Sequence, residues 1–177
     1  MKTIVNLFHP DYQDSRVNRA LVNAVSDEFE VRNIYELYPD FKIDVEKEKQ
    51  AMLAADRIVI EFPMHWYSAP ALLQQWEDVM ITPDWAFGPE GQLQGKDLLL
   101  AVTLGANNYG RDQFVKYTPN ELLRPFQAVS RVMGTNYLKP FEIVGARTIS
   151  DEDLAKAAKD YRAYLEQEEI PVLGDFE

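Results

Sequence analysis

The sequence contains no cysteine and only two histidines, His9 and His65. Without cysteine the chain can form no disulfide, bind no metal through thiolates and use no cysteine nucleophile. Two histidines also make a histidine-rich metal site an unpromising assignment. The composition therefore predicts neither a thiol-based nor a metal-based activity.

Basic residues and long apolar runs are also scarce. The chain has 18 Lys and Arg residues against 29 Asp and Glu, which gives a net charge of −11. This excess of acid argues against binding nucleic acid through phosphate contacts. No apolar run is long enough for a membrane span, and Met1 leads straight into an expected strand rather than a signal peptide. We therefore expect a cytoplasmic protein.

The 177 residues are enough for one domain with a sizeable core, and we expect a single domain over 1–177. Apolar segments with strand character alternate with segments of helical spacing. The expected strands cover 2–8, 28–34, 56–62, 97–103 and 137–144, and the expected helices cover 15–24, 45–55, 70–79, 122–133 and 150–165. This alternation predicts a three-layer α/β fold with a parallel sheet. In such folds ligands bind outside the carboxyl ends of the strands.

The most informative segment is the loop that follows the third expected strand. It reads Met64-His65-Trp66-Tyr67, and Pro70 then opens a helix. A strand-to-helix loop that places these side chains at exposed positions predicts a surface for a planar ligand, because the scaffold positions the loop and leaves its side chains free. His65 and Trp66 fit an ordinary core or surface role equally well.

Two further loops end at the same edge of the expected sheet. The segment 9–18 runs into a helix whose free N–H groups, together with the Ser15 hydroxyl and the Asn18 amide, suit a phosphate. It has neither a Walker loop nor a G-x-G-x-x-G pattern. The segment 103–106 after the fourth strand has small residues that let backbone N–H groups approach a ligand. Each loop alone fits a capped helix or a turn, but together they predict a site for a mononucleotide such as FMN.

At these residues the sequence resembles the flavodoxin-like NAD(P)H-quinone oxidoreductases. Within them it is most similar to the short bacterial flavoproteins that are ancillary subunits of glutathione-gated potassium efflux systems. The matching motifs are His9-Pro10 with Ser15-x-x-Asn18, Leu37-Tyr38-Pro39-Asp40-Phe41, Phe62-Pro63-Met64-x-Trp66-Tyr67-Ser68-x-Pro70, Leu72-Leu73 with Trp76, Trp85-Ala86-Phe87-Gly88, and Gly95-Lys96. The resemblance implies strand order 2-1-3-4-5, NAD(P)H as co-substrate and a homodimer with its active site at the interface. It also implies FMN rather than FAD, because the longer FAD-using relatives carry a C-terminal extension that this chain lacks.

The resemblance also assigns residues to the site. The implied cofactor-binding residues are His9, Ser15, Arg16, Val17, Asn18, Pro63, Met64, His65, Trp66, Tyr67, Thr103, Leu104, Gly105 and Ala106. Trp85 and Phe87 would wall the nicotinamide and quinone pocket of the partner subunit, and Tyr109 would be the catalytic group that also contacts substrate. Relatives with a Tyr/His pair place a histidine downstream of the fourth-strand loop, and this chain has none there.

We therefore expect a two-electron, ping-pong NAD(P)H:quinone oxidoreductase. One alternative is a regulatory subunit that docks on a potassium efflux transporter at the inner face of the membrane. Another is a one-electron flavodoxin, although those proteins normally have a Thr/Ser-rich loop where this chain has His9-Pro10. The sequence leaves open the physiological acceptor and the choice between NADH and NADPH.

Overall fold

The computed structural model describes residues 1–175 and contains one six-stranded sheet. The strands are β1 (Thr3–Leu7), β2 (Glu30–Asn33), β3 (Arg57–Pro63), β4 (Asp97–Leu104), β5 (Asn136–Tyr137) and β6 (Phe141–Val144). Their order is β2-β1-β3-β4-β5, with β6 also paired to β4, and every pairing is parallel. The expected α/β fold and strand order are confirmed, with one strand more than the sequence predicted.

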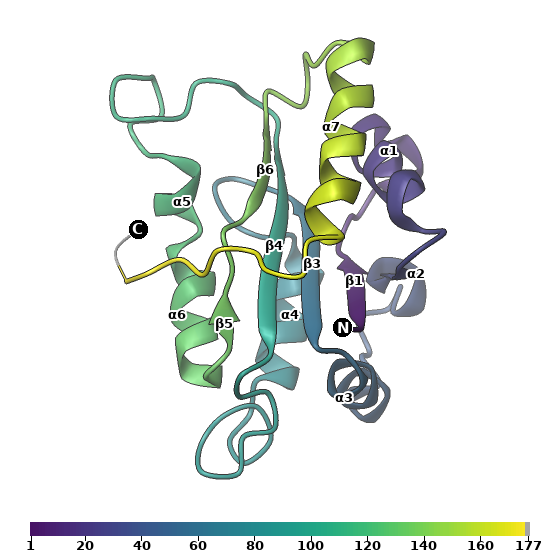
Figure 1. Ribbon diagram of the computed structural model, residues 1–177, viewed down its shortest axis with the longest axis vertical. Coiled ribbons are helices and arrows are strands. Elements are labelled where there is room, and N and C mark those ends of the chain that lie inside the picture. Colours follow the sequence, from purple (N-terminus) through teal and green to yellow (C-terminus); the bar gives the residue numbers. More distant parts are fainter. Residues whose placement is uncertain (176–177) are drawn as a thin grey trace.

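Helices cover both faces of the sheet (Figure 1). They are the 3-10 turn η1 (Tyr12–Asp14), α1 (Arg16–Val25), α2 (Ile34–Leu37), α3 (Val45–Ala54), α4 (Ala71–Met80), α5 (Pro119–Leu122), α6 (Arg124–Met133) and α7 (Asp151–Leu165). Buried residues of α1 and α7 pack together on one face, and buried residues of α3, α4 and α6 pack on the other. Of the helices in residues 1–175, none combines the length and the apolar character that a membrane span requires.

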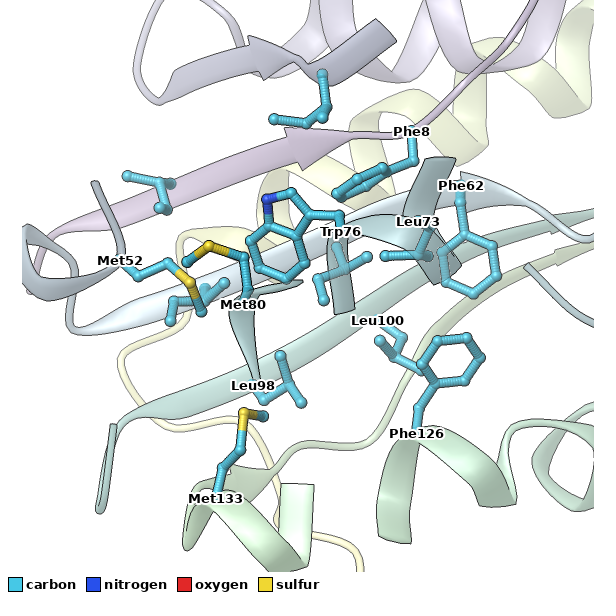
Figure 2. Packing of buried hydrophobic residues seen from close by; sticks show 14 of the residues in the cluster. Phe8, Met52, Phe62, Leu73, Trp76, Met80, Leu98, Leu100, Phe126 and Met133 are labelled. Carbon is cyan, nitrogen blue, oxygen red and sulfur yellow. The ribbon is translucent and has the colours of Figure 1, made fainter. Parts of the chain in front are cut away.

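The central strands are apolar almost throughout because both of their faces are covered. In β3, Ile58 and Phe62 point to the α3–α4–α6 face, and Val59 points to the α1–α7 face. Trp76 of α4 lies at the centre of the cluster on the α3–α4–α6 face. The Phe8 ring lies edge-on to it, with 5.6 Å between the ring centroids (Figure 2). The packed core holds the strands in place, and the strands in turn position the loops at their ends.

The expected fifth strand over 137–144 is wrong as a single element, because the chain forms two short strands there. Pro140 has no N–H to donate to a ladder, and the Lys139 N–H donates to the Pro171 carbonyl instead of to β4. The segment between β5 and β6 therefore leaves the sheet and rejoins it at Phe141. The return brings the loop after β6 to the carboxyl edge, at the top of Figure 1.

Candidate functional site

Two adjoining cavities open at the carboxyl edge of the sheet. The aromatic cavity has a volume of about 430 Å³, and the helix-end cavity, beside the start of α1, has a volume of about 370 Å³. The aromatic cavity is lined by Met64, His65, Trp66, Tyr67, Gly105, Ala106, Tyr109 and Arg147. The helix-end cavity is lined by His9, Ser15, Arg16, Val17, Asn18, Pro63, Met64, His65, Thr103, Gly105, Ala146 and Arg147. Four residues line both, so the two cavities form one trough.

The trough gathers nearly all residues that the sequence assigned to cofactor binding. The three loops after β1, β3 and β4 converge there, as the parallel topology requires. Leu104 is the exception, because its side chain is fully buried in the core and lines neither cavity. Any contribution of Leu104 to a ligand would come from its backbone.

A strained tight turn shapes the aromatic cavity. The His65 and Ser68 backbones exchange two N–H···O hydrogen bonds of 2.9 Å, with Trp66 and Tyr67 at the tip. Both tip residues have positive φ, 47° and 65°, as in a type I′ turn, a conformation that favours Asn and Gly. Trp66 is 90% exposed, and the Tyr67 ring lies edge-on to the Tyr109 ring at 6.4 Å. The turn therefore holds aromatic side chains in solvent at a cost in backbone energy, which is typical of a ligand-binding segment.

Replacing Trp66-Tyr67 by Asn-Gly should stabilise the protein and weaken ligand binding. The substitution relieves two left-handed aromatic residues, and we expect about 1–2 kcal/mol of added stability. The same change removes the aromatic faces of the cavity. Urea denaturation of the flavin-free protein measures the first effect and flavin titration measures the second. An Asn-Gly variant that is less stable than the wild type would contradict the assigned strain.

The N-terminus of α1 provides the other end of the trough. Ser15 is the N-cap, and its Oγ accepts the Asn18 N–H at 3.2 Å. The first N–H groups of a helix have no acceptor within the helix and carry partial positive charge. His9 Nδ1 accepts the Asp11 N–H at 3.1 Å, so a neutral His9 carries its proton on Nε2. Burial, followed by the neighbouring His65, lowers the pKa of His9. This end of the cavity offers donors to an anion.

The side chain of Asn18 faces inward rather than into the cavity. It is 1% exposed; its Nδ2 donates to Glu61 Oε1 at 3.1 Å, and its Oδ1 accepts from the Ser15 and Thr103 hydroxyls at 3.2 and 3.1 Å. The Asn18 amide thus holds the turn, and its expected contact with a phosphate stays a prediction. Burial raises the pKa of Glu61 to about 7, and the hydrogen bonds from Asn18 and Tyr161 act in the opposite direction.

Arg147 is a site residue that the sequence reasoning missed. It lies in the loop after β6, lines both cavities, and its backbone N–H donates to the Gly105 carbonyl at 3.1 Å. A Cβ on Gly105 would lie 2.9 Å from Arg147 Nε, so the arginine stem occupies the space that glycine leaves. The sequence did contain a signal, because a strand ending at Val144 also brings the following loop to the carboxyl edge.

Trp85 and Phe87 lie away from the trough. They belong to the loop between α4 and β4, at the amino edge of the sheet and the bottom of Figure 1. Trp85 is 5% exposed and packs in the core, with the Lys49 ammonium 5.5 Å from its ring centroid, and Phe87 is half-buried. One protomer does not bring them to the site, and their expected role in a partner's pocket stays a prediction.

A parallel sheet of this order, with a trough at the carboxyl ends of its strands, defines a flavodoxin-like α/β protein. The chain belongs to the flavodoxin-like fold family, whose model matches residues 1–165. A Bacillus subtilis protein described as the uncharacterized NAD(P)H oxidoreductase YrkL is 43% identical over 95% of this chain and 99% of its own. The glutathione-regulated potassium-efflux system ancillary protein KefF of an Enterobacter species is 38% identical over 89% and 91%.

Solved structures are similar over nearly the whole length. General stress protein 14 of Treponema denticola, in complex with FMN, shares 36% identity with a TM-score of 0.86 and covers 93% of this chain and 98% of its own. An NADPH-quinone reductase of P. pentosaceus shares 29% identity with a TM-score of 0.82, over 93% and 97%. A chain described as a thermophilic tryptophan halogenase from Streptomycin violaceusniger shares 41% identity with a TM-score of 0.90, over 93% and 98%. The names of these relatives thus cover more than one activity on one fold.

Proposed function

We propose that the protein is an FMN-dependent NAD(P)H:quinone oxidoreductase that transfers two electrons in a ping-pong reaction. The observation that carries the proposal is the continuous trough, in which an aromatic cavity for a flat ring adjoins a helix N-terminus for a phosphate. The oxidoreductase and quinone reductase names of relatives and the FMN complex of one of them support it. The flavin, when bound, supplies the hydride chemistry.

In this proposal the residues of the trough bind and orient the cofactor. The N–H groups at Arg16 and Val17, with His9 and Arg147, hold the phosphate. Met64 to Tyr67 flank the ring from one side, and the backbone at 103–106 faces its edge, where N–H groups stabilise negative charge. The exposed Trp66 and Tyr67 rings exclude water from the substrate side and stack on a flat acceptor, worth about 0.5–1.5 kcal/mol beyond area burial.

Tyr109 is proposed as the group that donates a hydrogen bond to the quinone oxygen. Its ring lies beside Tyr67 at the mouth of the aromatic cavity. Burial raises the pKa of Tyr109, and the neighbouring Tyr67 raises it further. The hydroxyl therefore keeps its proton at neutral pH. A protonated phenol is a donor to the charge that develops on a reduced quinone oxygen.

A homodimer is part of the proposal. Large aromatic side chains are exposed in the loop after β3 and in the loop after β4: Trp66 is 90% exposed, Phe114 84% and Tyr117 57%. Such a group of exposed aromatics is a surface that a second copy would cover. A transporter partner, as the name of the KefF relative suggests, is a separate proposal, and co-purification with a potassium efflux transporter would test it.

Purified protein should be yellow with bound FMN and should oxidise NADPH when menadione is the acceptor. We expect Tyr109→Phe to keep the FMN content and to lower kcat by about tenfold, because only the hydroxyl is removed. The measurements are the flavin absorbance of the purified protein and stopped-flow of each half-reaction. A colourless protein that cannot be reconstituted with FMN would falsify the proposal.

A further inference from the structure

A fully buried carboxyl lies directly beneath the N-terminus of α1. Glu61, in β3, has no exposed surface, and its oxygens accept from Asn18 Nδ2 at 3.1 Å and from the Tyr161 hydroxyl at 3.0 Å. Both donors are neutral, and among residues 1–175 no basic side chain is paired with this carboxyl. Buried carboxylates are ordinarily paired with a cation or held neutral, so this arrangement calls for a reason.

The hydrogen bond between Asn18 and Glu61 has a fixed direction. A carboxyl oxygen opposite an amide accepts from its NH₂ group, so Glu61 holds Asn18 Nδ2 and leaves Oδ1 as the acceptor for hydroxyl donors. Oδ1 then accepts from the hydroxyls of Ser15 and Thr103, at 3.2 and 3.1 Å, and both of these residues line the helix-end cavity. A chain of hydrogen bonds therefore runs from α7 through Glu61 to the cavity wall.

We propose that Glu61 is a positioning residue for the phosphate end of the cofactor site, acting through Asn18 and in its neutral form. The inference rests on the proposed function for the identity of the phosphate as that of FMN. Glu61 does not touch the cavity, so its effect on a ligand passes through the Asn18 amide and the two hydroxyls that this amide holds.

The neutral form keeps both contacts of the carboxyl and reverses the direction of one of them. Oε1 still accepts from Asn18, and a proton on Oε2 is donated to the Tyr161 oxygen, which donates to Oε2 when the carboxyl is ionised. The ionised form would instead add a negative charge one amide away from a bound phosphate, in an interior where like charges repel strongly. Burial raises the pKa of Glu61 to about 7, so its neutral form is populated up to neutral pH.

The groups that face Glu61 come from four elements. Asn18 faces it from α1, Tyr161 from α7, and Thr103 of β4 reaches it through Asn18. Tyr12 of η1 is also close enough to interact with the charge of Glu61. Burial is the larger cause of the raised pKa of Tyr12, and Glu61 is the second. None of these groups titrates between pH 6 and 8. In the helix-end cavity itself, the FMN phosphate also titrates, and burial followed by His65 lowers the pKa of His9 from its ordinary value.

The test compares FMN with riboflavin, which lacks the phosphate. Dissociation constants of both flavins are measured by fluorescence quenching for the wild type, Glu61→Leu and Glu61→Gln. We expect Glu61→Leu to raise the Kd of FMN by about tenfold or more and to leave the Kd of riboflavin within about twofold. Glu61→Gln reproduces the neutral carboxyl, since its Oε1 accepts from Asn18 and its Nε2 donates to Tyr161.

The pH dependence supplies the second readout. We expect the wild type and Glu61→Gln to have the same Kd for FMN at pH 6. At pH 8 the Kd of the wild type should be roughly several-fold larger than that of Glu61→Gln. Protonation of His9 and of the phosphate affects both proteins equally, so the ratio of the two constants isolates Glu61. Riboflavin should show no such divergence.

Glu77→Gln is the matched control. Glu77 is a half-buried carboxyl of α4 that lines neither cavity, and burial raises its pKa to about 7 as well. It should change neither the FMN-to-riboflavin ratio nor its pH dependence. Equal losses of FMN and riboflavin affinity in Glu61→Leu, or no loss of either, would overturn the inference and leave the proposed function standing. A wild type that binds neither flavin would overturn both.

Discussion

Glu48→Ala should lower the free energy of unfolding by about 3–5 kcal/mol, the cost of leaving a buried charge partner unpaired. Glu48, in α3, is fully buried. Its carboxylate accepts from both terminal nitrogens of Arg32, from the Tyr38 hydroxyl at 2.6 Å and from Trp76 Nε1 at 3.0 Å. Alanine would leave the phenol and the indole without an acceptor and the mostly buried guanidinium without its carboxylate partner.

This change acts on the whole fold because the carboxylate joins distant elements. Arg32 lies in β2, Trp76 in α4, and Arg32 Nη1 also donates to Asn6 Oδ1 of β1 at 2.9 Å. We expect the melting temperature to fall by about 10 °C, measured by calorimetry. Glu46→Ala in the same helix is the control: the Glu46 side chain is 76% exposed and pairs with Lys49 at the surface, so its loss should cost less than about 0.5 kcal/mol. Similar losses for the two variants would contradict the role assigned to Glu48.

Gly105→Ala should weaken FMN binding by about tenfold or more with little change in stability. The backbone of Gly105 does not have positive φ, so alanine fits its conformation. The new Cβ would lie 2.9 Å from Arg147 Nε and 3.3 Å from its Cδ and Cγ. An exposed, flexible arginine can move aside at small cost, but it would then leave both cavities and no longer face the proposed phosphate site.

A double-mutant cycle separates this mechanism from simple obstruction of the trough. If Gly105→Ala acts by displacing Arg147, its effect should disappear in an Arg147→Ala background. Arg111→Ala is the control for loss of a positive charge, because Arg111 is 83% exposed, lines neither cavity and pairs with Glu121. Additive effects of Gly105→Ala and Arg147→Ala in FMN titrations would show that the methyl group blocks the cofactor directly.

The fold was readable from local pattern to a large extent. Alternating strands and helices, the Ser15 cap and the proline before α4 gave the elements, and parallel topology then placed the loops after β1, β3 and β4 at one edge. The prediction of one continuous fifth strand was wrong. The hydrophobic pattern does not show that the Lys139 N–H donates to the Pro171 carbonyl instead of to β4. The left-handed turn at Trp66 and Tyr67 was also hidden, because its residues are not those that such a turn prefers.

The sequence by itself determined that this chain is a flavodoxin-like α/β protein with an aromatic loop and the start of a capped helix at one sheet edge. These features follow from residue types and their spacing over a few positions, where the physics is local. Only the tertiary structure decided that Arg147 lines the trough, that Asn18 turns inward to Glu61, and that Trp85 is buried at the opposite edge. Those contacts join residues tens of positions apart, and the packing of helices on the two faces of the sheet selects them.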